Sequence, residues 1–282
     1  MRANAGELFW GEVVTSRQNP TVKRVCALLE KKARRREGLF RFDGIKLLCE
    51  AVKKRLQIEL VVINEALEPS VKLGISELIG AGGIDLGRVL CVSPQVFERI
   101  SEEASPEGII TVAKIPAKIH SRVDNAGDYF AEGRLLIVEA MRDPGNLGTV
   151  IRSALALGID RLIISDDCAD LYNPRTVRAA MGALFSLRID TVETEALPTL
   201  IKSLRASGRE IYAAALTEDA RKINEIRLRE GDAFVIGNEG HGLSEAVIEA
   251  SSGAVIIPMT EGSESLNAAA AAAICIWETV RA

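Results

Sequence analysis

The feature that most constrains the fold is a series of apolar runs in the C-terminal half of the chain. Between residues 134 and 282, short runs rich in Val, Ile, Leu and Ala alternate with stretches whose apolar residues follow helical spacing. Unbroken apolar runs are typical of strands buried on both faces of a parallel sheet. The pattern therefore predicts an α/β domain with a parallel sheet. The predicted strands are 135–139, 162–165, 186–192, 211–216, 233–237 and 254–258.

The N-terminal part also alternates helices and strands, but over a shorter stretch. Asn19 followed by Pro20 is a helix start, with Asn as the cap and Pro in the first turn. We expect helices at 20–36 and 45–55, and strands at 40–42, 60–64, 89–92 and 109–113. The polar, aperiodic stretch that follows reads as a linker. The predicted domains are 1–118, a linker at 119–133, and 134–282.

Charge is distributed unevenly along the chain. The net charge of the whole chain is −4, but residues 17–55 contain thirteen Lys and Arg against four acidic residues. That stretch carries +9 and the rest carries −13. A basic N-terminal part is consistent with a polyanionic partner such as RNA, and equally with a solvated helix face.

The cysteine and histidine content excludes several kinds of site. The five cysteines are scattered without a CxxC pair, and there are only two histidines. Free thiols are therefore expected, and we predict no metal site. No apolar run approaches the roughly 18–20 residues that span a bilayer, and the first residues lack the apolar stretch of a secretory signal. We expect a cytoplasmic protein.

Three segments in the C-terminal half each run from a strand end through a Gly- or Ser-rich turn into a helix. They are Glu139-Ala-Met-Arg-Asp-Pro-Gly-Asn-Leu-Gly-Thr-Val-Ile-Arg152, Ile236-Gly-Asn-Glu-Gly-His-Gly-Leu-Ser244 and Ile256-Ile-Pro-Met-Thr-Glu-Gly-Ser-Glu-Ser-Leu-Asn267. Ligands of parallel α/β sheets bind at the carboxyl ends of the strands, so we expect one composite pocket.

Local reasoning assigns a role to some residues of these segments. Asn146 occupies a predicted N-cap position, and Gly148 leaves room for a ligand that Arg152 would reach. Glu239 lies within a Gly-rich loop that is neither a Walker loop nor a dinucleotide fingerprint. Either Ser265 or Asn267 would cap the last long helix. Each segment alone is also consistent with an ordinary turn or cap.

Taken together, the three segments closely resemble the signature motifs of the SpoU/TrmH family of RNA ribose 2′-O-methyltransferases, in the SPOUT class. The N-terminal segments Ser16-Arg-Gln-Asn-Pro-Thr-Val-Lys23 and Arg34-Arg-Arg-Glu-Gly-Leu-Phe40-Arg-Phe-Asp-Gly44 resemble the family's L30-like substrate-binding domain. The resemblance covers nearly the whole chain. It implies a C-terminal α/β domain with a deep trefoil knot, which composition and periodicity could not have suggested.

The resemblance also implies a cofactor, a partner and site residues. The cofactor is S-adenosylmethionine, the partners are RNA and a second copy of the chain, and each active site is built across the dimer interface. The expected catalytic residues are Asn146, Arg152, Glu239, Ser265 and Asn267. The expected cofactor-binding residues are Leu216, Gly237, Asn238, Gly242, Ile257, Met259 and Leu266. The expected RNA-binding residues are Asn19, Lys23, Arg34, Arg35, Arg36, Phe40, Arg41 and Lys46, with Phe40 stacking on a base.

Several alternatives stay open at this level. Arg152 could remove the hydroxyl proton, but deprotonating an arginine at pH 7 costs about 8–9 kcal/mol, which favours a cationic role. The substrate could be ribosomal RNA, which the long N-terminal part favours, or tRNA, and the modification could be housekeeping or confer antibiotic resistance. A non-catalytic RNA-binding protein of ribosome assembly would share the fold. A Rossmann-type enzyme would need a Gly-rich loop after the first strand, where the chain has Ala-Met-Arg-Asp-Pro-Gly-Asn.

Overall fold

The computed structural model describes residues 12–102, 105–260 and 265–281. The chain divides into two compact units. The N-terminal unit comprises residues 1–116 together with 172–178, and the C-terminal unit comprises residues 117–171 and 179–282. The short segment 172–178 therefore comes from the second half of the sequence but clusters with the N-terminal unit.

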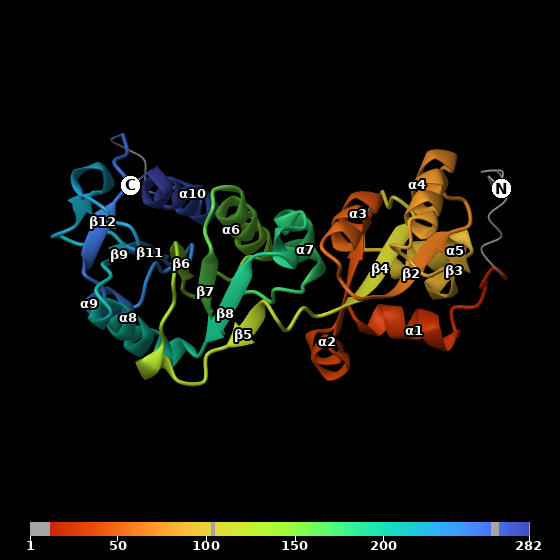
Figure 1. Ribbon diagram of the computed structural model, residues 1–282, viewed down its shortest axis with the longest axis horizontal. Coiled ribbons are helices and arrows are strands. Elements are labelled where there is room, and N and C mark those ends of the chain that lie inside the picture. The colour runs from red at the N-terminus through yellow and green to blue at the C-terminus, as the bar shows by residue number, and fades with distance from the viewer. Residues whose placement is uncertain (1–11, 103–104, 261–264, 282) are drawn as a thin grey trace. The chain divides into compact units, whose positions relative to one another are not determined.

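The N-terminal unit is built on a mixed four-stranded sheet with the strand order β1-β4-β2-β3 (Figure 1). The pairs β1/β4 and β4/β2 are antiparallel, whereas β2 and β3 are parallel. All four strands were predicted with ends within two residues of those observed. The strands are β1 (Leu39–Asp43), β2 (Ile58–Asn64), β3 (Val89–Val92) and β4 (Ile109–Lys114).

Helices cover both faces of this sheet. One face carries Val62 and Ile110 and packs against apolar residues of α1 and α5, among them Val25. The other face carries Val61 and Ile63 and packs against α3 and α4. Alternate residues of one strand thus serve two separate cores, as a strand periodicity of two requires. The helices are α1 (Pro20–Ala27), α2 (Lys31–Glu37), α3 (Ile45–Lys53), α4 (Pro69–Gly80) and α5 (Pro94–Ile100).

The helix predicted over residues 20–36 is two helices, with a break between Ala27 and Lys31. Arg34 explains the break. Its Nη1 atom donates hydrogen bonds to the carbonyl oxygens of Leu28 and Leu29, at 2.8 and 2.5 Å. Carbonyl groups at the end of a helix lack partners within the helix, and this guanidinium supplies them. At the other end of α1, the Asn19 side chain accepts from the backbone N–H of Thr21, as predicted for a cap.

The C-terminal unit contains an eight-stranded sheet in which every strand pair is parallel, as the apolar runs predict. The strand order is β10-β12-β9-β11-β6-β7-β8-β5. The strands are β5 (His120–Arg122), β6 (Leu135–Val138), β7 (Arg161–Ser165), β8 (Arg188–Val192), β9 (Ile211–Ala214), β10 (Arg221–Lys222), β11 (Ala233–Ile236) and β12 (Gly253–Ile256).

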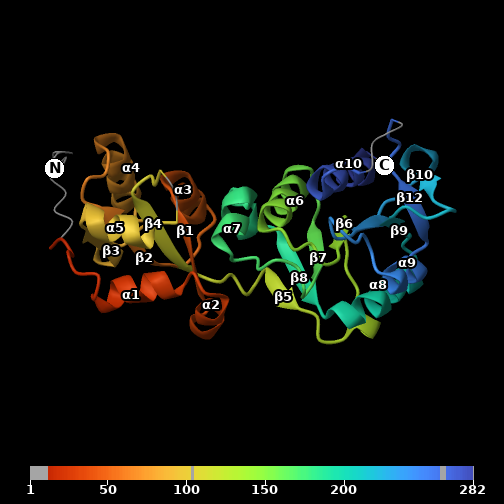
Figure 2. The same ribbon diagram turned by 180° about the vertical axis from the view of Figure 1, so that it is seen from behind.

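Helices α8 and α9 cover one face of this sheet, and α6 and α10 lie together on the other (Figures 1 and 2). The alanine-rich start of α10 packs closely against α6 and β11, with Ala268, Ala269 and Ala272 buried. None of the described helices is long and apolar enough to cross a membrane. The helices are α6 (Pro144–Ala156), α8 (Leu197–Ala206), α9 (Glu245–Ala250) and α10 (Ala268–Arg281), and α7 (Pro174–Ala180) lies between β7 and β8 in sequence.

The segment 119–133, predicted as a linker, is structured within the C-terminal unit. It contributes β5, which pairs with β8 at the edge of the sheet. Buried Asp190 on β8 ties this segment down, because its carboxylate accepts hydrogen bonds from Ser121, Tyr129 and Arg161. These donors hold the pKa of Asp190 below its ordinary value even though burial alone would raise it. The C-terminal unit therefore begins before the predicted domain boundary.

Candidate active site

The first motif forms the end of β6, a loop and the start of α6. The helix begins at Pro144, and Asp143 is its N-cap, with Oδ1 accepting from the backbone N–H of Asn146 at 2.8 Å. The prediction that Asn146 caps this helix is therefore wrong. Because Asp143 satisfies the helix end, the Asn146 side chain is available for other contacts.

Asn146 joins the second and third motifs. Its Nδ2 donates to Glu239 Oε1 at 2.8 Å, and its Oδ1 accepts from Asn267 Nδ2 at 3.0 Å. Asn267 is itself fixed, since its Oδ1 accepts from the backbone N–H groups of Ala269 and Ala270 and so caps α10. Of the two predicted caps, Asn267 is thus the one observed. We call Asn146, Glu239 and Asn267 the polar trio.

The loop that carries Glu239 is held by its own backbone. Asn238 and Gly242 exchange two backbone hydrogen bonds of 2.9 and 3.0 Å. A Cβ atom added to Gly237 would lie 2.3 Å from the carbonyl carbon of Gly242, so this position requires glycine. The Asn238 side chain accepts from the N–H groups of Gly240 and His241 and donates to the Ala140 carbonyl oxygen. The loop therefore presents exposed Glu239 in a defined position.

Glu139 is a structural member of the first motif that the sequence reasoning missed. It is 4% exposed, and its two carboxylate oxygens accept from the backbone N–H and the hydroxyl of Ser244, at 2.8 and 2.6 Å. This contact fixes the start of α9 to the end of β6. The available signal was its place as the first residue of the motif, directly after a buried strand.

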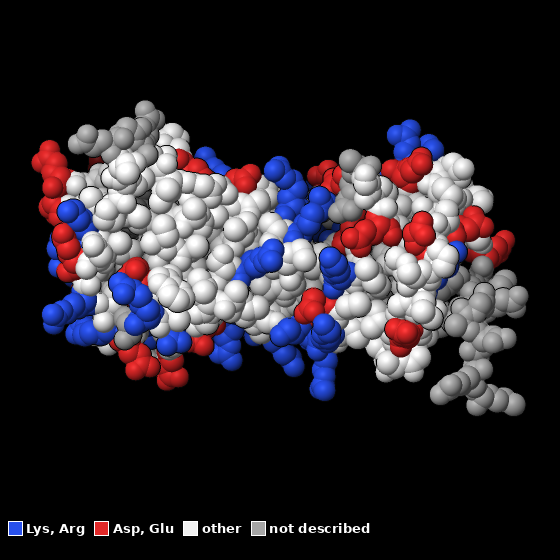
Figure 3. All heavy atoms as spheres, turned by 90° about the horizontal axis from the view of Figure 1, so that it is seen from above, with Lys and Arg blue, Asp and Glu red and all other residues white. Residues whose placement is uncertain are grey.

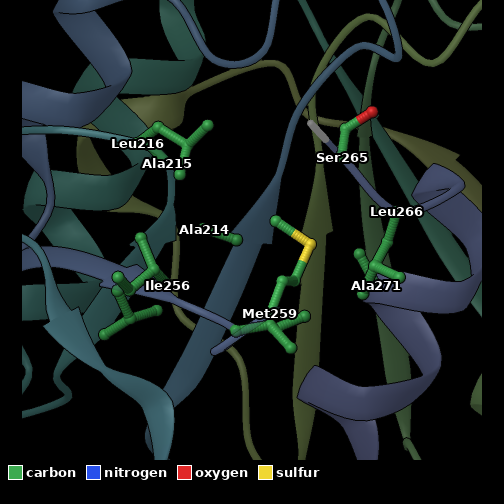
Figure 4. Close-up of a pocket in the computed structure, with 10 residues that line it drawn as sticks. Ala214, Ala215, Leu216, Ile256, Met259, Ser265, Leu266 and Ala271 are labelled. Atoms are coloured by element: carbon green, nitrogen blue, oxygen red, sulfur yellow. The ribbon is translucent and has the colours of Figure 1, made fainter. Parts of the chain in front are cut away.

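An apolar cavity lies beside the polar trio. Two adjoining pockets, of about 160 and 470 Å³, share the wall residues Leu216, Ser265, Leu266 and Ala271. Met259 projects between Leu216 and Leu266 (Figure 4). Three side chains of this rim remain exposed to water, Leu216 at 77%, Leu266 at 41% and Met259 at 38%. An apolar cavity with exposed apolar edges is typical of a small-molecule site.

All seven residues predicted to bind the cofactor line this cavity. Ile257 and Met259 line the smaller pocket, and Gly237, Asn238 and Gly242 line the larger one, while Leu216 and Leu266 belong to both. Glu239 and Ser265 also contribute to the larger pocket. The smaller pocket is lined by apolar side chains apart from Ser265, which suits a flat heterocycle. Residues 261–264 of the third motif lie outside the described residues.

Arg152 is not joined to the polar trio in the described part of one chain. It lies exposed on α6 and makes no hydrogen bond or ion pair with the described residues. The predicted open space above Gly148 is not observed, because Gly148 is buried in the packing of α6. The prediction that a ligand lies over Gly148 is therefore wrong.

The two cysteines of the C-terminal unit are buried thiols. All five cysteines are free, and Cys168 and Cys275 are buried. Burial raises the pKa of the Cys168 thiol to about 11 and that of Cys275 to about 12, so both stay protonated at neutral pH. Burial also lowers the pKa of His120 to about 4, which leaves this histidine neutral.

The eight residues predicted to bind RNA do not form one surface. Phe40 is fully buried and its ring packs against Phe42, so the prediction that it stacks on a base is wrong. Arg34 and Arg41 are also buried, at 3% and 1% exposure, because their guanidinium groups hydrogen-bond to main-chain carbonyls. Arg34 and Arg41 were expected at the surface because they are charged, but both are buried.

Four of the eight residues remain exposed cations. Lys23 lies on α1, Arg35 and Arg36 on α2, and Lys46 on α3. Arg36 is paired with Glu37 at 3.1 Å. Since α1 and α3 cover opposite faces of the sheet, Lys46 is separated from Lys23 by the sheet itself. Asn19 is occupied as the cap of α1.

Comparison with family models agrees with this architecture. Residues 133–277 match the SpoU rRNA Methylase family, and residues 19–111 match the MRM3-like substrate binding domain. The first match covers the three motifs and seven of the eight strands of the sheet that carries them.

Individual relatives cover most of the chain. A 23S rRNA (guanosine(2553)-2′-O)-methyltransferase, RlmP, from Bacillus subtilis is 31% identical over 94% of this chain and 97% of its own length. A 23S rRNA (uridine(2479)-2′-O)-methyltransferase from Streptomyces viridochromogenes is 32% identical over 68% of this chain and 67% of its own.

A solved structure shows the same fold with a bound cofactor. The AdoMet-bound rRNA methyltransferase from Sinorhizobium meliloti superposes with a TM-score of 0.77 at 28% identity, covering 96% of this chain and 97% of that one. The family match, the convergence of the three motifs and the apolar cavity lead to one conclusion. The chain belongs to the SpoU rRNA methylase family and is an RNA ribose methyltransferase that uses S-adenosylmethionine.

Proposed function

We propose that this enzyme methylates a ribose 2′-hydroxyl in large-subunit ribosomal RNA. The observation that carries the proposal is the polar trio, in which one residue from each motif is hydrogen-bonded to the next at the edge of the apolar cavity. The names of the RlmP and Streptomyces viridochromogenes relatives support ribosomal RNA as the substrate class. They specify different bases, so the target nucleotide does not follow from family membership. Such an enzyme would work where ribosomes assemble, which we propose to be the cytoplasm.

The cavity residues would hold S-adenosylmethionine. Bound there, the cofactor would supply a sulfonium methyl group whose transfer to the ribose oxygen breaks the S–CH3 bond and leaves a neutral thioether. The apolar walls from Leu216, Met259 and Leu266 suit the adenine ring, and the backbone of the 237–242 loop offers polar partners. The knot that the family resemblance implies stays a prediction for this chain.

The polar trio would position the reacting groups. Asn146 is oriented from both sides, by Glu239 and by the helix cap Asn267, so its rotamer is determined. Such preorganisation holds a hydroxyl in line with its reaction partner, and small displacements are costly in rate. Arg152 would act as a cation that grips the adjacent phosphate and stabilises the developing negative oxygen.

We further propose that two copies of the chain form the working enzyme. Helices α6 and α10 contain only Arg152, Glu278 and Arg281 as charged residues, and Figure 3 shows a broad area with few charged side chains over these helices. Trp277 is 55% exposed and Leu155 is 37% exposed on this face. A large uncharged face with an exposed Trp is typical of a protein interface. Arg152 lies on this face, where it could serve the site of the other copy.

The N-terminal unit would bind the RNA. Its match to the MRM3-like substrate binding domain supports this role, and exposed Lys23, Arg35 and Arg36 would contact phosphates. We propose that substrate binding and cofactor binding are divided between the N-terminal and C-terminal units.

The decisive experiment measures transfer of a tritiated methyl group from S-adenosylmethionine to unmodified large-subunit ribosomal RNA. Asn146→Ala should lower turnover about a hundredfold, because alignment is lost, while calorimetry shows unchanged cofactor affinity. Asn125→Ala, which removes an amide from an exposed turn, is the matched control. Full turnover of Asn146→Ala would refute the role of the trio.

A subunit-mixing experiment tests the shared site. If Arg152 serves the partner's trio, a mixture of Arg152→Ala and Asn146→Ala chains regains about a quarter of wild-type activity, since half the dimers contain one intact site out of two. If each chain carries a complete site, the mixture stays as inactive as its parents.

A further inference from the structure

A second pocket lies next to the cofactor cavity, on the other side of the 238–243 loop. It has a volume of about 250 Å³ and is lined by Glu139, Ala140, Arg142, Asp167, Thr194 and the His241 segment. It shares Asn238, His241, Gly242 and Leu243 with the larger cofactor pocket. The two pockets therefore share one loop as a common wall.

Ala140, which lines this pocket, has a strained backbone whose N–H and carbonyl groups are both hydrogen-bonded. Ala140 has φ +53°, a left-handed backbone conformation that costs an alanine about 1–2 kcal/mol. Its N–H donates to Ser165 Oγ at 2.8 Å, and its carbonyl accepts from Asn238 Nδ2 at 2.7 Å. Strain that the surroundings maintain in this way is concentrated at functional sites.

The Asp167 carboxylate in the pocket is positioned by a buried hydroxyl group. Fully buried Ser165 donates its hydroxyl proton to Asp167 Oδ1 at 2.6 Å. The other oxygen, Oδ2, lies 3.7 Å from Arg142 Nη2, which is close enough for charge attraction but too long for a hydrogen bond. Side-chain exposure is 32% for Asp167 and 69% for Arg142. Both groups can therefore hydrogen-bond to a ligand in the pocket.

Several other polar side chains of the pocket are already occupied, whereas the exposed His241 side chain makes no hydrogen bond with the described residues. Both oxygens of Glu139 accept from Ser244, and the Thr194 hydroxyl donates to Asp166. The pocket thus offers the Asp167 carboxylate as an acceptor beside the Arg142 guanidinium as a donor, with the His241 imidazole also in its lining. Its volume lies just below the range of about 300–1,000 Å³ for sites that take drug-sized ligands, and it suits a single flat ring system.

We propose that this pocket reads the base of the nucleotide to be methylated, and that the base is guanine. This inference rests on the proposed function. Guanine presents two adjacent donors, N1–H and the 2-amino group, next to the O6 acceptor. The donors match Asp167 and O6 matches Arg142. Uracil offers a single donor between two acceptors, and adenine and cytosine present a ring acceptor beside their amino group. These bases leave the carboxylate or the guanidinium incompletely paired.

The first test identifies the labelled nucleoside. Unmodified large-subunit ribosomal RNA transcribed in vitro is incubated with the full-length enzyme and tritiated S-adenosylmethionine, then digested to nucleosides. The label is expected in 2′-O-methylguanosine. Label in any other nucleoside overturns the assignment of guanine. A protein that binds S-adenosylmethionine in calorimetry yet labels no RNA overturns the proposed function and this inference with it.

The second test removes a hydrogen-bonding group from the protein and, separately, from the target base. Asp167→Asn should lower kcat/KM by roughly 5- to 150-fold with unchanged cofactor affinity, as expected for loss of a bidentate base contact. RNA with inosine at the target, which lacks the 2-amino group, should be a poorer substrate for the wild type, whereas Asp167→Asn should barely distinguish inosine from guanosine. Glu193→Gln is the control, since Glu193 pairs with Arg122 outside the pocket. Equal discrimination by the wild type and Asp167→Asn, with methylguanosine still formed, overturns the base-reading role alone.

Discussion

The two units differ in where the structure places the residues that the sequence assigned to ligand binding or catalysis. In the C-terminal unit, polar residues chosen from three motifs meet in one hydrogen-bonded trio beside a cavity. In the N-terminal unit, Arg34, Phe40 and Arg41 were chosen in the same way and are buried. A motif residue can therefore stabilise the fold instead of binding the ligand. Its burial distinguishes the two roles.

The largest effect should come from a scaffold residue of the N-terminal unit. Arg41 donates to the Ile100 carbonyl at 2.7 Å and to Asp43 at 3.1 Å, and it is 1% exposed. Arg41→Ala leaves the Asp43 carboxylate without its cation in a buried site, so we expect a loss of about 3–5 kcal/mol of unfolding free energy. Chemical denaturation of the full chain measures it.

A paired variant sharpens this result. Arg41→Met combined with Asp43→Asn removes both charges, and much of the lost stability should return. If Arg41→Ala instead leaves the unfolding free energy unchanged and weakens RNA binding, the contrast between the two units fails.

Next in size is a backbone effect in the C-terminal unit. Gly237→Ala places a methyl group 2.3 Å from the Gly242 backbone, so the loop must move. We expect a loss of about 3 kcal/mol in stability and a marked loss of cofactor affinity in calorimetry. Gly240→Ala is the matched control, because the added carbon meets only the Asn238 side chain at 3.5 Å. Equal behaviour of the two variants would contradict the self-packed loop.

The next effect depends on pH and arises from His120 on β5. His120 has a pKa lowered to about 4 by burial, against about 6.5 in the unfolded chain. The unfolded state therefore takes up a proton first as the pH falls, and stability present above pH 6.5 is lost between pH 6.5 and 4, by up to about 3 kcal/mol. His120→Asn should flatten that part of the stability profile. An unchanged profile would mean that His120 is solvated.

The smallest effect concerns the exposed cations of the N-terminal unit. Arg35→Ala should leave stability nearly unchanged and weaken RNA binding in a way that depends on salt. The slope of log K against log salt should decrease by about one unit if Arg35 contacts a phosphate. Filter binding at several salt concentrations measures the slope, with Lys53→Ala on α3 as the control. An equal change for both variants would indicate a diffuse charge effect.

Much of the fold could be predicted because buried strands leave long apolar runs, and the six C-terminal strands were identified in this way. Two strands were missed. β5 reads His-Ser-Arg and β10 has two residues, so neither carries an apolar pattern. The N-cap of α6 was misassigned because Asp143 and Asn146 are both good caps, and only geometry decides between them. The convergence of the motifs was predicted from the rule that ligands bind at the carboxyl ends of parallel strands, whereas the hydrogen bonds of the polar trio were not, since spacing alone does not report side-chain contacts.

The exposed apolar rim of the cavity has a practical consequence. Leu216, Met259 and Leu266 face water, and a ligand that covers them adds its binding free energy to that of folding. A ligand at a hundred times its dissociation constant stabilises the folded chain by about 2.7 kcal/mol. The melting temperature of this protein should thus rise with cofactor concentration, so that simple heating in a dye assay can rank cofactor analogues before any RNA substrate is in hand.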